Sequence, residues 1–170
     1  TKLCEAIAGL TRRIASEPLP PGCLQAFVVS RLVALDKGGG QVRPIGVGEA
    51  VRRLACMAIA QATKTEVMKA CGAMQVCCGL SGGCEAGARA MQRLWEREDT
   101  EAVLLIDARN AFNEMCRAEA LRTAGSHCPM LHTALCNIYG HPSELRLSDG
   151  SHILSEEGTT QGCPLGMAMF

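Results

Sequence analysis

Ala102-Val103-Leu104-Leu105-Ile106-Asp107-Ala108-Arg109-Asn110-Ala111-Phe112 is the stretch of the chain that decides the expected fold. Its first five residues are apolar and partly β-branched, which predicts a short buried strand over 102–106. A carboxylate directly after a buried strand is costly unless it meets a cation or a polar partner. Phe112 comes five residues after Asp107, in a turn expected to open a helix. This pattern can hold a divalent metal beside a pocket, although a lone Asp at a strand end is also typical of simple turn capping.

The charge of the chain is balanced in total but divided along the sequence. With 170 residues it has the length of one domain or most of one, and its formal net charge is zero. Residues 1–70 carry ten Lys or Arg against five acids, whereas residues 71–170 carry seven against twelve. A zero net charge alone argues against a general nucleic-acid binder. A basic part facing an acidic part suits a site that holds polyphosphate on one side and metal ions on the other.

The eleven cysteines predict reduced thiols rather than a disulfide framework. Their number is odd, most lie in apolar, helix-like contexts, and no C-x-x-C pair offers zinc-ligand spacing. No signal peptide is recognised, and the longest apolar stretches are too short to cross a bilayer. We therefore expect an intracellular protein, nuclear or cytoplasmic and not secreted, with no membrane partner and no disulfide-linked partner.

Local patterns predict a mixture of helices and strands rather than regular βαβ units. Helical spacing and helix stop signals predict five helices, over 2–15, 49–70, 81–97, 116–124 and 129–139. Alternating or β-branched runs predict two hairpins besides the strand at 102–106, with strands at 27–35, 42–47, 144–148 and 151–155. The first hairpin has a glycine-rich tip, the second turns at Asp149-Gly150, and Pro164 is expected to begin a further helix.

Two further segments carry side chains suited to a phosphate-bearing ligand. The loop Glu156–Gly166 contains Gln161, a donor and acceptor, beside glycines that let backbone approach a ligand closely. Lys37 and Arg43 place cations on the glycine-rich hairpin. Taken singly, each segment could equally be an ordinary loop or an inert exposed hairpin.

Taken together and in this order, the three segments resemble reverse transcriptases, especially the polymerase domain of non-LTR retrotransposons. Gln41–Val47, followed by Arg52-Arg53, is similar to a fingers motif of that family. Ile106–Phe112 is similar to its first palm motif, and Gln161-Gly162-Cys163-Pro164-Leu165-Gly166 to its Q-G-x-P-L-G motif. The similarity extends over roughly residues 25–170 and departs at Cys163, where the family more often has Asp or Ser.

The resemblance implies an α+β fold, the fingers and partial palm of a right-hand polymerase, with helices packed on a small antiparallel sheet. Residues 1–24 would form an N-terminal helix and linker, 25–100 a fingers-like region and 101–170 a partial palm, incomplete at its C-terminal end. RNA template, DNA primer and dNTP would be the partners. One of Arg52 and Arg53 would touch template backbone, although a solvated helix face fits them equally well.

The resemblance also implies a role for each matched position of the site. Asp107 and the carbonyl of Ala108 would bind metal, as part of a site for two Mg²⁺ ions in the complete enzyme. The amides of Asn110 and Ala111 would approach the triphosphate, and Phe112 would act as the steric gate against a ribose 2′-OH. The remaining substrate-binding positions would be Lys37, Arg43, Gln161 and Gly162.

The family's paired-Asp palm motif has no counterpart within these 170 residues, because no Asp follows Asp149. Asp107 alone would not hold two Mg²⁺ ions tightly, since hard cations take several oxygen ligands. We therefore expect the chain by itself to be inactive as a polymerase. A non-catalytic nucleic-acid-binding remnant of a retroelement and a maturase-like cellular reverse transcriptase are the alternatives.

Overall fold

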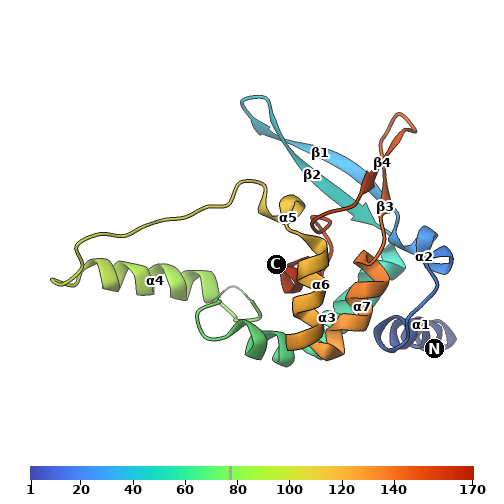
Figure 1. Cartoon of the computed structure of the whole chain (residues 1–170), viewed down its shortest axis with the longest axis horizontal. Coiled ribbons are helices and arrows are strands. Elements are labelled where there is room, and N and C mark those ends of the chain that lie inside the picture. The colour runs from blue at the N-terminus through green and yellow to red at the C-terminus, as the bar shows by residue number, and fades with distance from the viewer. Residues whose placement is uncertain (77) are drawn as a thin grey trace.

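The computed structural model describes residues 1–76 and 78–170 and combines helices with one small sheet (Figure 1). In this part of the chain there are eight helices and four strands. In chain order the elements are α1 (Lys2–Ser16), α2 (Pro21–Val28), β1 (Ser30–Gly38), β2 (Gln41–Gly48), α3 (Ala50–Cys71), α4 (Gly83–Trp95), α5 (Ala111–Glu114), α6 (Arg117–His127), α7 (Pro129–Tyr139), β3 (Ser143–Arg146), β4 (His152–Ser155) and α8 (Gly166–Met169).

The sheet joins two hairpins in the order β2-β1-β3-β4. Each hairpin is antiparallel, and β1 pairs with β2 from Ser30 opposite Gly48 to the glycine-rich tip. Between the hairpins β1 runs parallel to β3 over two residue pairs, Ser30 with Leu145 and Arg31 with Arg146. The sheet is therefore mixed, and the expectation of an antiparallel sheet is wrong at this junction. The local turn chemistry specified each hairpin, but it carried no information about how the two would meet.

The core lies where α1, α3 and α6 pack around α7, below the sheet in Figure 1. Leu131 and Leu135 of α7 are fully buried, together with Ile14 of α1 and Cys56 of α3. Leu165, at the start of α8, closes the same cluster. Because aliphatic and thiol side chains fill this core, the chain needs few aromatic residues.

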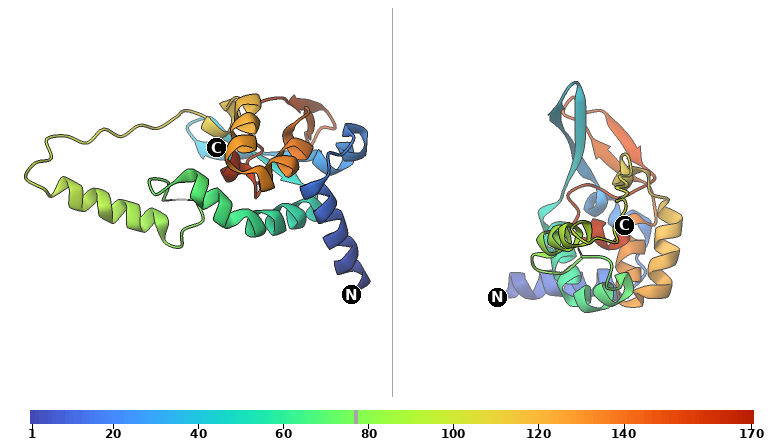
Figure 2. Two further views of the ribbon diagram at one scale, coloured as in Figure 1. Left: turned by 60° about the horizontal axis from the view of Figure 1, so that its bottom comes forward. Right: turned by 90° about the vertical axis from the view of Figure 1, so that its left-hand side faces the viewer.

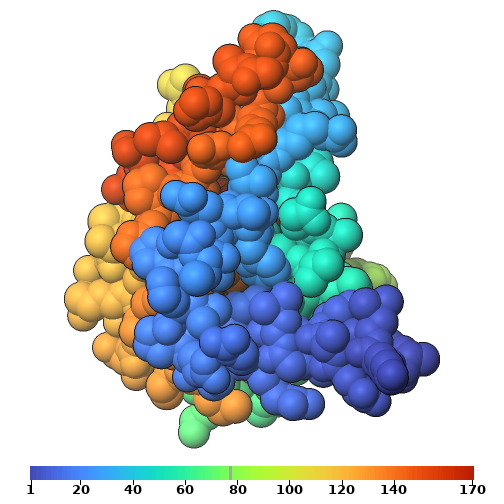
Figure 3. Space-filling view, turned by 90° about the vertical axis from the view of Figure 1, so that its right-hand side faces the viewer, coloured from blue at the N-terminus to red at the C-terminus, as the bar shows by residue number. Residues whose placement is uncertain are grey.

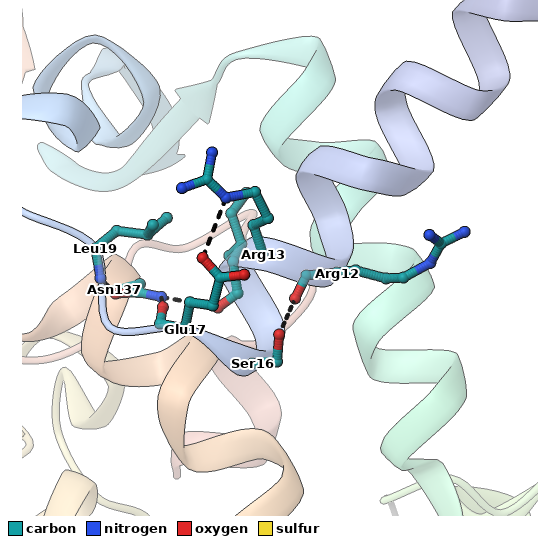
Figure 4. A network of polar contacts seen from close by, with 7 residues as sticks. Arg12, Arg13, Ser16, Glu17, Leu19 and Asn137 are labelled. Atoms are coloured by element: carbon teal, nitrogen blue, oxygen red, sulfur yellow. Dashed lines mark hydrogen bonds and ion pairs between the residues drawn. The ribbon is translucent and has the colours of Figure 1, made fainter.

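Asn137 of α7 fixes the C-terminal end of α1 (Figure 4). Its amide nitrogen donates to the carbonyls of Ile14 and Glu17, each at 2.8 Å, and its amide oxygen accepts from Leu19 N–H at 2.9 Å. The last carbonyls of a helix have no partner within the helix, so a side chain from a neighbouring helix satisfies them here. The N-terminal half of α1 projects from the body, as the space-filling view shows (Figure 3), and Leu3 is 70% exposed there.

Several predicted elements are confirmed, with differences at their ends. The helices expected over 2–15, 49–70 and 129–139 and both hairpins are present. The strand expected from Phe27 begins only at Ser30, because Pro21 opens α2 at its first helical position. The helix expected to stop at Gly125 continues to His127, since Gly125 serves close packing instead: a Cβ there would lie 3.2 Å from the ring of His132.

The strand predicted over 102–106 is wrong. Residues 101–108 have no regular secondary structure, and Leu104, Leu105 and Ile106 are each more than 80% exposed. A strand needs hydrogen-bonded neighbours, and none of the described strands lies beside this segment. Together with α4 it extends away from the body (Figure 1, and Figure 2, left).

None of the described helices is long and apolar enough to span a membrane.

We predict that Asn137→Ala destabilises the protein by about 2–4 kcal/mol, because it leaves one buried and two partly buried backbone groups without their partner. Urea unfolding followed by circular dichroism measures the loss. Ser16→Ala is the matched control, since this exposed hydroxyl only donates to the Arg12 carbonyl within α1 (Figure 4). Equal midpoints for the two variants would show that Asn137 does not hold α1.

Candidate functional site

A cleft of about 580 Å³ lies between the β1–β2 hairpin, the segment 107–112 and the loop that precedes α8. All nine residues that the sequence motifs indicate for metal or substrate line it, although they come from three segments far apart in the chain. They are Lys37, Arg43, Asp107, Ala108, Asn110, Ala111, Phe112, Gln161 and Gly162.

The hairpin gives the cleft its cationic wall. Lys37 stands at an irregularity in the β1–β2 register, between Asp36 and Gly38, and Arg43 lies on the facing strand opposite Leu35. Gly38, Gly39 and Gly40 at the tip all have positive φ, which allows this tight turn. Among the described residues, neither Lys37 nor Arg43 forms an ion pair, so both charges remain available to a ligand.

Asp107 supplies the acidic side of the cleft from an exposed, irregular segment. Downstream of it Asn110 adopts a left-handed conformation, φ +54°, which Asn tolerates better than most residues. Its side chain donates to Glu114 at 3.1 Å and accepts from Asn113 at 2.6 Å, which fixes the turn into α5. The sequence predicted a turn here but gave no sign of this local bonding.

Phe112 lies on the floor of the cleft in contact with a second ring. Its centroid lies 4.9 Å from that of Phe170, with the ring planes tilted by 38°. Offset and tilted pairs of this kind are favourable for aromatic rings. Nothing in the sequence pattern pointed to Phe170 as the partner.

The loop at 158–162 contacts the hairpin on one side. Gly46 N–H donates to the carbonyl of Gln161 at 3.0 Å. A Cβ on Gly46 would lie 2.0 Å from the Thr160 methyl, and one on Gly162, where φ is +109°, would lie 3.1 Å from the Gly46 carbonyl. Glycine at 46 therefore avoids the Thr160 side chain, and glycine at 162 allows the positive φ of the tight approach.

The same loop contacts the Phe112 segment on its other side. Thr159 N–H donates to the carbonyl of Phe112 at 2.7 Å, and Gly158 N–H donates to that of Met115 at 2.9 Å. A Cβ on Gly158 would lie 2.3 Å from the Phe112 carbonyl oxygen. The loop thus joins the hairpin to the aromatic residue and sets the spacing of the cleft.

Behind the loop lies a group of polar side chains that the sequence motifs did not connect. The neighbouring Cys56 thiol lowers the pKa of Cys163 to about 6, while Cys163 and burial raise the pKa of Cys56. Cys163 also lines the cleft. The position at which the sequence differs from the motif, residue 163, therefore lies beside Cys56 and Tyr139.

Arg52 does not lie on a solvated helix face, so that expectation is wrong for this residue. It is 4% exposed, and its guanidinium donates to the Val28 carbonyl and to the Ser30 hydroxyl, the latter at 3.0 Å. It thereby caps the C-terminal end of α2, where a cation is favoured. Arg53, the next residue, is exposed.

The donors available to a metal fit Mg²⁺ in type but not in number. The carboxylate of Asp107 and the carbonyl of Ala108 are hard oxygen ligands of the kind Mg²⁺ takes. No cluster of three or more metal-ligating side chains occurs in residues 1–76 and 78–170. A cation here would depend on oxygens supplied by the ligand itself.

We predict that Gly46→Ala opens the contact between hairpin and loop and destabilises the protein by about 1–3 kcal/mol, because the new methyl overlaps Thr160. Thermal unfolding and the amide chemical shifts of Thr160 to Gly162 measure both effects. Gly9→Ala is the control, since a Cβ at this helical position meets nothing within 4 Å. Unchanged loop shifts in Gly46→Ala would refute the close contact.

Comparison of the chain with models of known protein families gave no match, and no curated protein sequence matched it. A function for this cleft must therefore be argued from its own residues.

Proposed function

We propose that the chain is part of an RNA-directed DNA polymerase of a retroelement and that the cleft binds the incoming dNTP. The observation that carries the proposal is the convergence of nine residues on a single cleft, although they belong to three short motifs separated by more than forty residues each. In this proposal the β1–β2 hairpin and α3 belong to the fingers, and α5 to α8 with β3 and β4 to a partial palm.

The distribution of charge across the cleft supports a nucleoside triphosphate as ligand. Lys37 and Arg43 line the cleft from the β1–β2 hairpin, and Asp107 lines it from the segment 107–112. Free cations can neutralise phosphate oxygens directly, whereas a carboxylate repels them unless a divalent ion lies between. Two Mg²⁺ ions, when bound in the complete enzyme, would activate the primer hydroxyl and neutralise the developing phosphate charge.

The remaining residues of the cleft would orient the nucleotide. Phe112 would occupy the space that a ribose 2′-OH needs, so that deoxyribose is accepted and ribose is rejected by overlap. Gln161 offers both a donor and an acceptor, and Gly162 allows close approach of backbone. The RNA template and the DNA primer would extend from this cleft. The primer 3′-OH would lose its proton and attack the α-phosphate, and the bond between the α- and β-phosphates would break to release pyrophosphate.

A non-catalytic nucleic-acid-binding remnant is the second candidate, and one observation favours it. Asp107 is exposed and is the one carboxylate among the described residues lining the cleft. Such a remnant would bind polyphosphate through Lys37 and Arg43 without needing a divalent ion. The dependence of nucleotide binding on Mg²⁺ separates the two candidates.

We predict that the 170-residue chain binds dATP more tightly with Mg²⁺ than with EDTA, and that Asp107→Asn abolishes this difference. The carboxylate would hold the ion that bridges to the phosphates, so the neutral amide loses the gain. Titration followed by amide chemical shifts of Ala111 and Gly162 measures affinity and location together.

Glu98→Gln is the charge-matched control for this experiment. It also removes one acidic charge from an exposed residue, but it lies outside the cleft. Binding that is equal with and without Mg²⁺ in the unmodified chain would favour the remnant. Absence of any shift in the cleft would refute a nucleotide site.

We further predict that Phe112→Val raises the affinity for ATP relative to dATP by about tenfold, roughly 1.4 kcal/mol. Removal of the ring relieves the overlap with the 2′-OH, and overlaps of this size cost about 1–3 kcal/mol. Competition between the two nucleotides in the presence of Mg²⁺ measures the ratio. An unchanged ratio would remove Phe112 from the gating role.

A further inference from the structure

A buried arginine outside the cleft lies directly behind the turn that holds Phe112. Arg117 is the first residue of α6 and is only 5% exposed. It does not line the cleft, and the proposed nucleotide site assigns it no role. A buried guanidinium is costly unless its donors are satisfied, so its partners indicate what it does.

All of its described hydrogen-bond partners belong to a single turn between β4 and the cleft loop. Its side chain donates to the carbonyls of Ser155 at 2.9 Å, Glu157 at 2.9 Å and Gly158 at 3.0 Å, and to the Ser155 hydroxyl at 2.9 Å. Its backbone N–H donates to the carboxylate of Glu157 at 2.8 Å. The ring of Tyr139 lies beneath the guanidinium, 5.5 Å from centroid to Cζ.

Three backbone carbonyls in successive parts of one turn therefore converge on one planar group. Burial lowers the pKa of Arg117, but a guanidinium remains protonated at neutral pH, so it keeps all its donors. A lysine ammonium could not reproduce this pattern, because its three donors radiate from one atom. The planar arrangement of the guanidinium donors, and not only their positive charge, thus sets the shape of the turn.

The same turn holds the gate residue. Gly158 and Thr159 donate their N–H groups to Met115 and Phe112, and a Cβ on Gly158 would overlap the Phe112 carbonyl. A displacement of the Gly158 carbonyl from Arg117 would therefore pass directly to the Phe112 backbone. Two hydrogen-bond steps separate the guanidinium from the residue whose ring faces the ligand.

We propose that Arg117 is a positioning residue for Phe112 and thereby a determinant of the selection of dNTP over rNTP. This inference rests on the proposed nucleotide site, because selection has meaning only there. The guanidinium fixes the turn at 155–158, and the turn fixes the Phe112 carbonyl. The position of the Phe112 ring relative to the sugar of a bound nucleotide is thereby fixed.

Amide hydrogen exchange tests the structural half of the inference without any ligand. In Arg117→Met we expect the amides of Gly158 and Thr159 to exchange at least tenfold faster, relative to the Leu135 amide in the core. Arg122→Met is the matched control, since Arg122 is an exposed arginine of the same helix whose side chain pairs, among the described residues, with Glu119 alone. Acceleration of all three amides by one factor would reveal general destabilisation and would overturn the proposal.

Nucleotide competition tests the functional half. In the presence of Mg²⁺ we expect Arg117→Met to lower the preference for dATP over ATP severalfold, and Arg117→Lys to restore less than half of it. Gly158→Ala, which leaves Arg117 intact but pushes on the Phe112 carbonyl, should lower the preference as well. If Arg117→Met does not fold, Arg117→Lys decides the matter, and an undiminished preference in that variant would overturn the proposal.

The outcomes separate this inference from the proposed function. If Phe112→Val changes the preference but neither Arg117→Met nor Gly158→Ala does, the positioning role is refuted while the nucleotide site stands. If Phe112→Val leaves the preference unchanged, the gate itself is refuted, and the role of Arg117 in selection is refuted with it. A loss of preference in Arg122→Met equal to that in Arg117→Met would also contradict the proposal.

Discussion

The cleft depends on a short loop that is hydrogen-bonded on both sides. Gln161 accepts from Gly46 of the hairpin, and Thr159 donates to Phe112. Each bond contributes only about 1 kcal/mol net, so the bonds alone do not explain the geometry. The glycines at 46 and 158 do, because side chains there would overlap the opposing chain. Close backbone contact on two faces of one loop fixes the distance between the cationic hairpin and the aromatic ring.

The elements that could be predicted from the sequence are those specified by nearby residues. The helix over 129–139 begins at a proline, and the second hairpin turns at Asp149-Gly150, so both were predicted nearly to the residue. The strand over 102–106 failed because a strand is specified by its neighbours as well as by its own composition. The parallel pairing of β1 with β3 was missed for the same reason, since two residue pairs leave no pattern in either sequence.

The residues of the candidate site also differ in whether nearby sequence specifies them. Its nine predicted residues were found because each belongs to a short motif, and the cleft brings those motifs together. The buried polar residues that fix the surrounding elements were not found. Arg52, Arg117 and Asn137 are buried polar side chains whose partners are mainly backbone groups more than twenty residues away. Every residue has a backbone carbonyl, so a side chain that bonds to one leaves no pattern in the sequence. The role of these three residues can therefore be recognised only in the structure.

The two sides of the cleft differ in how firmly the fold holds them, and this difference bears on the chemistry. Phe112 is held by the Thr159 bond, by the fit against Gly158 and by the ring of Phe170. Asp107 follows three apolar residues that are each more than 80% exposed and has no hydrogen bond among the described contacts. Preorganised groups bind without an ordering cost, whereas a carboxylate without support must be oriented by its ligand. In the proposed nucleotide site, this difference would favour shape recognition of the sugar over tight binding of the metal, and a cation would enter the cleft together with the phosphates that help to coordinate it.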